Sequence, residues 1–328
     1  MSEQDKLNEL VSVHLGKAGD GSVVNPYVTP DDVDKNLLVA VPRYLNRVGY
    51  GIDDKDLPFE GYDAWNGYEF STLLKNGFPV SGTLKFVYPA NTPNIVESKS
   101  VKLYLNSFNM AKLIDSVEDI HIIEEIIATD IGNAVWGKKI YDRDDHFNDT
   151  DDWLDIDVAI HIGDICTIKP FRHTYIPLEE VVDVEGLTFD QYNESEDIIK
   201  NEMHDFVTNQ KGTLKVRSNS LRSNCRVTNQ PDWGDVYIHI KGDLPTKESL
   251  LQYIVSMRRE NHFHEEICEC IYKRLLDKFN PEELMVGCLY TRRGGIDINP
   301  VRANDKHLVW ELGHIQDAYQ LCTKTPRQ

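Results

Sequence analysis

The amino-acid sequence predicts an α+β protein made of two copies of one unit, each with two helices on one face of an antiparallel sheet. Two observations support this prediction. The order strand, strand, helix, helix, strand occurs between residues 63 and 162, and again between residues 213 and 290. The chain has 328 residues, 41% of them hydrophobic, which is enough for a sizeable core. A repeated order of elements is most simply explained by a repeated unit.

The first copy begins with two strands. Residues 63–70 lead into a predicted strand, and residues 83–89 form a second, with the turn expected at Ser81-Gly82. A proline and a Ser/Lys/Ser run then predict a loop that turns into a helix after Glu97. A long amphipathic helix follows and ends by Gly137. Its core positions are Ile120, Ile123, Ile127, Ile131 and Ala134. Residues 157–162 close the copy as a strand.

The second copy repeats this order. Strands at 212–217 and 236–240 flank a polar loop, and helical stripes follow at 250–257 and 263–275 before a strand at 284–290. We expect the first unit within residues 1–170, a linker at 171–211 and the second unit at 212–328. The linker contains a predicted helix that ends at Phe206-Val207.

Charge and composition exclude several classes of protein. The net charge is −19 and the pI about 4.9, so the chain lacks the basic surface that binds nucleic-acid backbones. No apolar run is long enough to span a bilayer, and Met1 to Lys6 lack the features of a signal peptide. Six cysteines show no disulfide framework in so long a chain. We expect a cytoplasmic protein with free thiols that binds neither nucleic acid nor membrane.

The polar loop of the second copy carries a candidate nucleophile. Cys225 lies between two predicted strands, and Asp232 follows it after a proline turn. Loops held by rigid elements often carry catalytic groups. The alternative is structural, with Cys225 as a small buried filler and Asp232 as a turn residue. The residue pair alone leaves both interpretations open.

Two further carboxylates stand where predicted helices begin. Glu97 precedes the Ser/Lys/Ser run, where it could complement the helix dipole or accept hydrogen bonds from the N–H groups of a ligand. His264 and Glu265 begin the second helix of the second copy. They could serve as an acid/base helper and a hydrogen-bond acceptor, or as plain first-turn residues.

Two segments suggest metals, but neither has the right pattern. The acidic run 142–152 lacks the central glycine of an EF-hand loop, so a solvated acidic loop is the better interpretation. Two histidines and two cysteines lie within 260–270, yet Cys268 and Cys270 are two apart on a helix and point to different faces. We therefore predict no metal site.

A short run after the last strand suits an anion. Arg292 and Arg293 are fixed cations followed by the flexible backbone of Gly294 and Gly295. This combination fits a dinucleotide phosphate. The alternative is an ordinary hairpin turn with exposed arginines.

Four motifs together resemble the QueF-type nitrile reductases, the 7-cyano-7-deazaguanine reductases of queuosine biosynthesis, a tRNA-modification pathway. The matching segments are 97–104 (Glu-Ser-Lys-Ser-Val-Lys-Leu-Tyr), 223–233 around the cysteine, 263–265 (Phe-His-Glu) and 292–300 (Arg-Arg-Gly-Gly-Ile-Asp-Ile-Asn-Pro). Their order resembles the long, two-module branch of the family. The likeness extends from about Leu38 to Pro300.

The resemblance implies two tandem tunnelling-fold modules, a homodimer, and no metal. It implies that Cys225 attacks the nitrile carbon to form a thioimide, with Asp232 as the proton-transfer group and His264 assisting. NADPH would reduce the adduct to the primary amine. Substrate binding would fall to Glu97, Ser98, His264 and Glu265. Cofactor binding would fall to Ser100, Lys102, Arg292, Arg293, Gly294 and Gly295.

Three departures from the family pattern stand out: Arg226 follows the cysteine where an apolar residue is expected, the segments 142–152 and 185–211 are long, and the charge is very acidic. Two other functions remain open. One is a zinc hydrolase similar to GTP cyclohydrolase, which a zinc assay would identify. The other is a non-catalytic purine- or pterin-binding module, which the pairing of Cys225 with Asp232 disfavours.

Overall fold

The computed structural model describes residues 30–137, 156–162, 168–201, 211–226, 229–326 and 328. Three sequence expectations lie outside these residues. They are the solvated acidic loop at 142–152, the end of a linker helix at Phe206-Val207, and the expectation that Met1 to Lys6 are not part of a signal peptide. In the described part of the chain, no helix is both long and apolar enough to cross a membrane.

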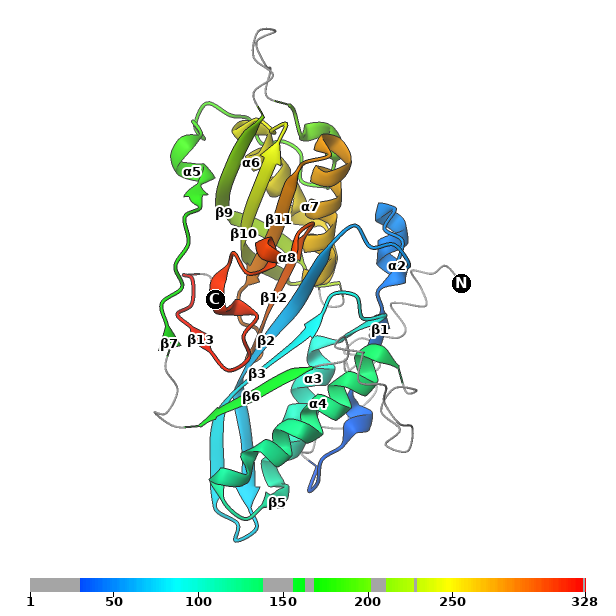
Figure 1. Ribbon diagram of the computed structural model, residues 1–328, viewed down its shortest axis with the longest axis vertical. Helices are drawn as coiled ribbons and strands as arrows, with labels where there is room; N and C mark the ends of the chain where they lie inside the picture. Colours follow the sequence, from blue (N-terminus) through cyan, green and yellow to red (C-terminus); the bar gives the residue numbers. More distant parts are fainter. Residues whose placement is uncertain (1–29, 138–155, 163–167, 202–210, 227–228, 327) are drawn as a thin grey trace, which may run out of the picture.

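One large sheet runs through both halves of the chain (Figure 1). Its strand order is β6-β3-β2-β12-β11-β10-β9-β8, with β5 beside β2. All pairs are antiparallel except β2 with β5 and β8 with β9. The strands are β2 (Glu60–Leu74), β3 (Pro79–Pro89), β5 (Lys112–Ile114), β6 (Asp157–Ile162), β8 (Ile176–Pro177), β9 (Gly212–Asn224), β10 (Pro231–Gly242), β11 (Glu283–Tyr290) and β12 (Ile296–Ala303).

The two halves join where β12 pairs with β2. The register runs from Ile296 opposite Gly67 to Ala303 opposite Glu60. Every residue of β12 is buried, as expected for a central strand covered on both faces. Long-range pairing of this kind leaves no local signal in the sequence.

Four helices pack on the sheet, two in each half, as the sequence predicts (Figure 1). They are α3 (Ser98–Asn106), α4 (Ile120–Trp136), α6 (Lys247–Ser256) and α7 (His264–Phe279). The stripe of Ile123, Ile127 and Ile131 on α4 packs in a core with Leu84 and Phe86. On α7, Ile267, Ile271 and Leu275 pack in a second core with Leu284 and Val286. The protein is therefore α+β with a largely antiparallel sheet.

The last residues of the chain cover the opposite face of the sheet. Val309, Leu312 and Ile315 pack in a third core with residues of β2 and β11. The ammonium of buried Lys85 donates hydrogen bonds to the carbonyls of Asp317, at 2.6 Å, and Gln320, at 2.8 Å. The elements here are α8 (Lys306–Val309), η8 (Gly313–Ile315) and β13 (Leu321–Cys322), which pairs with β7 (Ile168–Lys169).

Short elements connect these layers. β1 (Ala40–Pro42) pairs with β4 (Asn94–Val96), which ends directly before Glu97. The remaining elements are η1 (Lys35–Leu37), α2 (Tyr44–Arg47), η2 (Val48–Tyr50), η3 (Ser107–Met110), η4 (Val117–Asp119), α5 (Leu178–Val181), η6 (Glu196–Ile198) and η7 (Met257–Arg259).

The turn predicted at Ser81-Gly82 is wrong, because both residues lie inside β3. The chain turns instead at residues 75–78, where the Asn76 side chain accepts the N–H of Phe78 and Gly77 has a φ of 90°. An Asn-Gly pair is a strong hairpin signal. Gly82 is explained by packing, since a Cβ there would lie 2.5 Å from the carbonyl oxygen of His161 on β6.

A buried ion network joins the two halves. The guanidinium of Arg302 on β12 lies 2.9 Å from Asp63 on β2 and 2.9 Å from Glu269 on α7. Arg47 of α2 reaches Glu269 at 2.7 Å, and Arg43 reaches Asp63 at 2.6 Å. Burial alone would raise the pKa of Glu269, but the charges of Arg47 and Arg302 outweigh it and lower this pKa to about 2.

We predict that Glu269→Gln strongly destabilises the fold, because it leaves buried guanidiniums without their counter-charge. Removing one member of a buried ion pair typically costs about 3–5 kcal/mol. Urea unfolding at neutral pH should show a large fall in midpoint. Lys211→Met, which removes an exposed ion pair with Glu282, serves as the control and should barely shift it. Equal midpoints for the two variants would contradict this account.

Candidate active site

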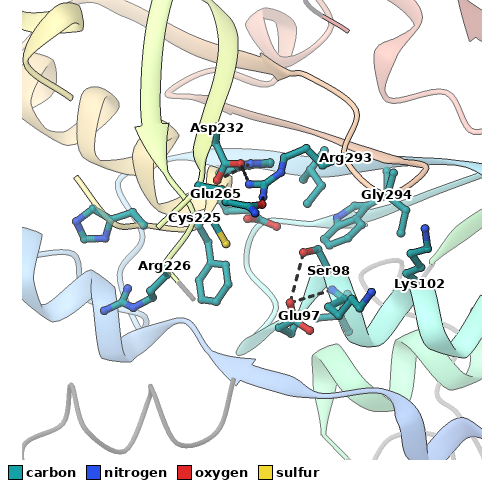
Figure 2. A pocket seen from close by; sticks show the side chains of 18 residues that line it. Glu97, Ser98, Lys102, Cys225, Arg226, Asp232, Glu265, Arg293 and Gly294 are labelled. Carbon is teal, nitrogen blue, oxygen red and sulfur yellow. Dashed lines mark hydrogen bonds and ion pairs between the residues drawn. The ribbon is translucent and has the colours of Figure 1, made fainter. Parts of the chain in front are cut away.

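A cavity of about 330 Å³ lies where the two halves meet. Its walls come from the β9–β10 loop, the start of α7, the start of α3 and the β11–β12 turn (Figure 2). Nine of the residues that the sequence singles out line it. They are Glu97, Ser98, Lys102, Cys225, Asp232, His264, Glu265, Arg293 and Gly294.

Cys225 stands in the loop between β9 and β10, as predicted. Its N–H donates to the carbonyl of Gln230 at 2.8 Å, and its own carbonyl accepts the N–H of Asn229 at 3.0 Å. Asn229 adopts a left-handed φ of 56°, which asparagine tolerates better than most residues. Cys225 is partly exposed, whereas Cys268, Cys270 and Cys288 are fully buried. The alternative of a buried filler does not describe Cys225.

Asp232 is the second residue of β10, opposite Ser223, and is buried, with 3% of its surface exposed. One carboxylate oxygen lies 3.5 Å from Nε2 of His264, and the other forms an ion pair with Arg293. Burial would raise the pKa of Asp232, but hydrogen bonding to His264 and the charges of His264 and Arg293 together lower it. Asp232 is therefore held as a carboxylate.

His264 occupies the first position of α7 and stacks on the ring of Tyr290, with centroids 3.8 Å apart and planes 5° from parallel. The stacking and the contact with Asp232 fix the imidazole plane. Its Nδ1 is buried and has no hydrogen-bond partner among the described residues. His264 thus faces Asp232 through Nε2 and lines the cavity.

Glu265 is buried, with 2% of its surface exposed, and Oε1 has no hydrogen-bond partner in the described part of the chain. Burial, followed by the charge of Asp63, raises the pKa of Glu265 to about 8. A buried polar atom without a partner is costly in a folded protein. At a cavity wall, such an atom marks a position where a ligand can supply the missing hydrogen bond.

Glu97 is the N-cap of α3, so the helix-start interpretation is confirmed. Its carboxylate accepts the N–H groups of Lys99, at 2.8 Å, and Ser100, at 2.7 Å. It also accepts the hydroxyl of Ser98 at 3.4 Å (Figure 2). The same residue lines the cavity.

The candidate cofactor residues divide into two groups. Lys102, Arg293 and Gly294 line the cavity, and Gly294 has a φ of 55°. Ser100, Arg292 and Gly295 are not among the lining residues. Ser100 is buried in the start of α3, where its hydroxyl donates to the carbonyl of Glu97 at 2.6 Å. The guanidinium of Arg292 lies 4.3 Å from the ring centre of Tyr68.

The apolar walls were not predicted as parts of a site. Trp65, Val96, Phe263, Ile296 and Ile298 line the cavity. Trp65 is fully buried and stacks on Phe86, so in the sequence it is indistinguishable from a core residue. In the sequence, Phe263 stands out only as part of the Phe-His-Glu motif. Its position directly before the helix that carries His264 is the signal that indicates a cavity wall.

The cysteines and histidines of residues 260–270 do not gather around one point. Cys268 donates to the carbonyl of Val286 at 3.4 Å, whereas Cys270 contacts the hydroxyl of Tyr253 at 3.8 Å. Among the described residues, no group of three or more His, Cys, Asp or Glu side chains could hold a metal ion.

Comparison with known proteins agrees with these motifs. The family described as nitrile reductase, 7-cyano-7-deazaguanine-reductase N-term matches residues 29–140, and the QueF-like protein family matches residues 231–308. Curated proteins named NADPH-dependent 7-cyano-7-deazaguanine reductase from Rickettsia massiliae and Rickettsia prowazekii are 37% and 38% identical over 276 residues. Each alignment covers 84% of this chain and 90% of the relative.

A solved structure, the archaeosine synthase QueF-Like in the apo form, matches 29% of this chain and 94% of its own with 19% identity and a TM-score of 0.26. The curated relatives cover far more of the sequence. On their identity and coverage, the chain belongs to the NADPH-dependent 7-cyano-7-deazaguanine reductases, a family of nitrile reductases.

Proposed function

We propose that this chain reduces the nitrile of 7-cyano-7-deazaguanine to an aminomethyl group with NADPH, through a covalent thioimide on Cys225. Family membership supports the overall reaction and the cofactor. The observation that carries the covalent step is a partly exposed thiol in the same cavity as a buried Asp232–His264 pair. The deciding experiment is loss of NADPH absorbance on addition of this nitrile.

The covalent step balances without an added reagent. A thiolate is the side-chain nucleophile best suited to a nitrile carbon near neutral pH. As the sulfur–carbon bond forms, one π bond of the nitrile breaks and its nitrogen takes up a proton. Asp232, which the structure holds as a carboxylate, accepts the thiol proton, and His264 relays a proton to the nitrogen.

The cavity rim suits the cofactor. NADPH supplies the hydride for each of the two reductions that turn a thioimide into a primary amine. Lys102 and Arg293 are cations whose side chains are 26% and 33% exposed, and Gly294 lies between them in the lining. Partly exposed cations beside a flexible backbone fit phosphate groups. These residues would hold the cofactor so that its nicotinamide can reach the adduct.

Two carboxylates anchor the deazaguanine in this proposal. A guanine-like edge presents adjacent N–H donors, which a carboxylate accepts. Glu265 offers an oxygen that has no hydrogen-bond partner among the described residues, and Glu97 lines the same cavity from the other half of the chain. Ser98 lies beside Glu97, and the apolar walls enclose the flat ring system.

We also propose that the chain consists of two tunnelling-fold modules, residues 1–170 and 212–328, joined by the linker 171–211. Each half supplies antiparallel strands and two helices, which supports this division. We place the protein in the cytoplasm, as a reaction that uses a reduced cofactor and a free thiol requires a reducing environment.

Our first prediction here concerns the covalent adduct, which needs no hydride. Without NADPH, intact-protein mass spectrometry should show one nitrile added per chain. Cys225→Ala should show none. Cys322→Ala, which removes another partly exposed thiol, should react like the wild type. Asp232→Asn should bind the nitrile but form the adduct about 10²–10⁴ times more slowly, as for a lost general base. An adduct on Cys225→Ala would refute the assignment.

A second prediction follows from the raised pKa of Glu265. Substrate N–H donors favour its ionised form, so binding releases the proton that Glu265 carries below a pKa of about 8. Affinity for the nitrile should therefore rise with pH towards 8, by up to about tenfold per unit, and then level off. Glu265→Gln should bind more weakly by about 1.5–3 kcal/mol and lose this pH dependence. Calorimetry that finds the same pH profile in both proteins would contradict the prediction.

A third prediction is that two copies of the chain form a homodimer. In the described part of the sheet, β6 is an outer strand with one neighbour. Unpaired strand edges favour pairing between chains. Light scattering should give about twice the chain mass of 37.7 kDa. A single species of the chain mass at working concentration would exclude the dimer.

A further inference from the structure

Arg226 directly follows the nucleophile, in a place where the family pattern leads us to expect an apolar residue. Its side chain is 5% exposed, and its guanidinium lies 2.7 Å from the carboxylate of Glu266 on α7. A buried cation needs a counter-charge, which explains how this chain tolerates an arginine there. Arg226 therefore connects the loop of Cys225 to the start of α7.

Glu266 gathers three donors on one oxygen. Its Oε2 accepts Nη1 of Arg226 at 2.7 Å, the N–H of Phe263 at 3.0 Å, and contacts Nδ1 of His262 at 3.1 Å. Phe263 and His262 immediately precede His264 and, like Arg226, line the cavity. One buried carboxylate thus links the residue after the nucleophile to the segment that presents the acid/base histidine and Glu265.

The charges around Glu266 are compatible with this role. Burial would lower the pKa of His262, but hydrogen bonds to Glu260 and Glu266 raise it to about 9, so the imidazole is a cation at neutral pH. Two cations, Arg226 and His262, therefore share Glu266. Charge-assisted hydrogen bonds of this kind are stronger than neutral ones and restrict geometry.

Two residues from the first half of the chain also contact His262 and Arg226. Tyr50, the last residue of η2, places its hydroxyl 3.0 Å from Nε2 of His262. Asn46 of α2 accepts a longer hydrogen bond from Arg226, at 3.5 Å. The orientation of the nucleophile loop thus depends on both halves.

We propose that Glu266 and Arg226 are positioning residues that hold the Cys225 loop against the start of α7, and so fix the sulfur relative to Asp232 and His264. The inference rests on the proposed role of Cys225 in the covalent step. Neither residue takes part in bond making. Their contribution is geometric, and a displacement of about 1 Å can cost roughly 10²-fold in rate.

The test compares Arg226→Met and Glu266→Gln with the wild type. Arg226→Met keeps the length of the side chain, and Glu266→Gln keeps an oxygen that can cap α7. We expect adduct formation without NADPH to slow by about 10- to 100-fold, while the nitrile dissociation constant changes by less than about threefold. The double variant should be no slower than the slower single variant, because both act through one pair. Arg226→Lys should restore part of the rate.

Lys273→Met is the matched control, because it removes an ion pair with Asp277 elsewhere on α7. It should leave the adduct rate unchanged. Hydrogen exchange provides a readout that does not need the substrate. The amide protons of Cys225 and Asn229, both bonded within the loop, should exchange faster in Arg226→Met and Glu266→Gln but not in Lys273→Met.

Adduct rates and loop exchange equal to those of Lys273→Met would overturn the proposal. A rate loss that merely follows the folded fraction, measured by thermal unfolding, would overturn it as well. If the wild type itself formed no adduct, the covalent function would fail, and exchange in the loop would still decide whether Glu266 and Arg226 position it.

Discussion

The geometry of the site depends on how α7 is fixed against the joined halves of the sheet. Glu269 anchors this helix through buried Arg302 and Arg47, and Arg302 also binds Asp63 on the strand that pairs with β12. Because these groups are fully desolvated, each is costly unless the others are in place. The network therefore fixes the helix, and with it His264 and Glu265 at its start, relative to both halves of the chain.

Three acidic residues on α7 show how local surroundings separate chemically identical groups. Glu269 is surrounded by guanidiniums, which lower its pKa to about 2. Glu266 is paired with Arg226. Glu265 lies one turn before Glu269, yet burial and the charge of Asp63 raise its pKa to about 8. Glu269 and Glu266 are thus held in ion pairs, whereas Oε1 of Glu265 has no hydrogen-bond partner among the described residues. Groups with displaced pKa values are expected where a protein binds or reacts with its substrate.

The sequence predicted the local features well and the non-local ones poorly. The helix ending at Gly137 and the loop around Cys225 follow from periodicity and turn residues, and the structure confirms both. Two contacts join residues that are distant in the chain, so no local pattern reveals them. They are the pairing of β12 with β2 and the ion pair of Arg226 with Glu266. Arg292 and Arg293 look equivalent in the sequence. In the structure, Arg293 forms an ion pair with Asp232 in the cavity, whereas the guanidinium of Arg292 lies over the ring of Tyr68.

The division of the site between the halves has a mechanistic consequence. Cys225, Asp232 and His264 come from the second half, whereas Glu97 and Lys102 come from the first. The three groups proposed to exchange protons are thus held by one hairpin and one helix. Among the residues proposed to bind substrate and cofactor, Glu97 and Lys102 lie at the start of α3 in the first half, whereas Glu265 and Arg293 lie in the second. A ligand held by these residues would therefore contact both halves. Glu265, which lacks a partner among the described residues, lies on the reactive side. The groups proposed for binding and for chemistry therefore meet at the start of α7, where His264 contacts Asp232 and the next residue is Glu265.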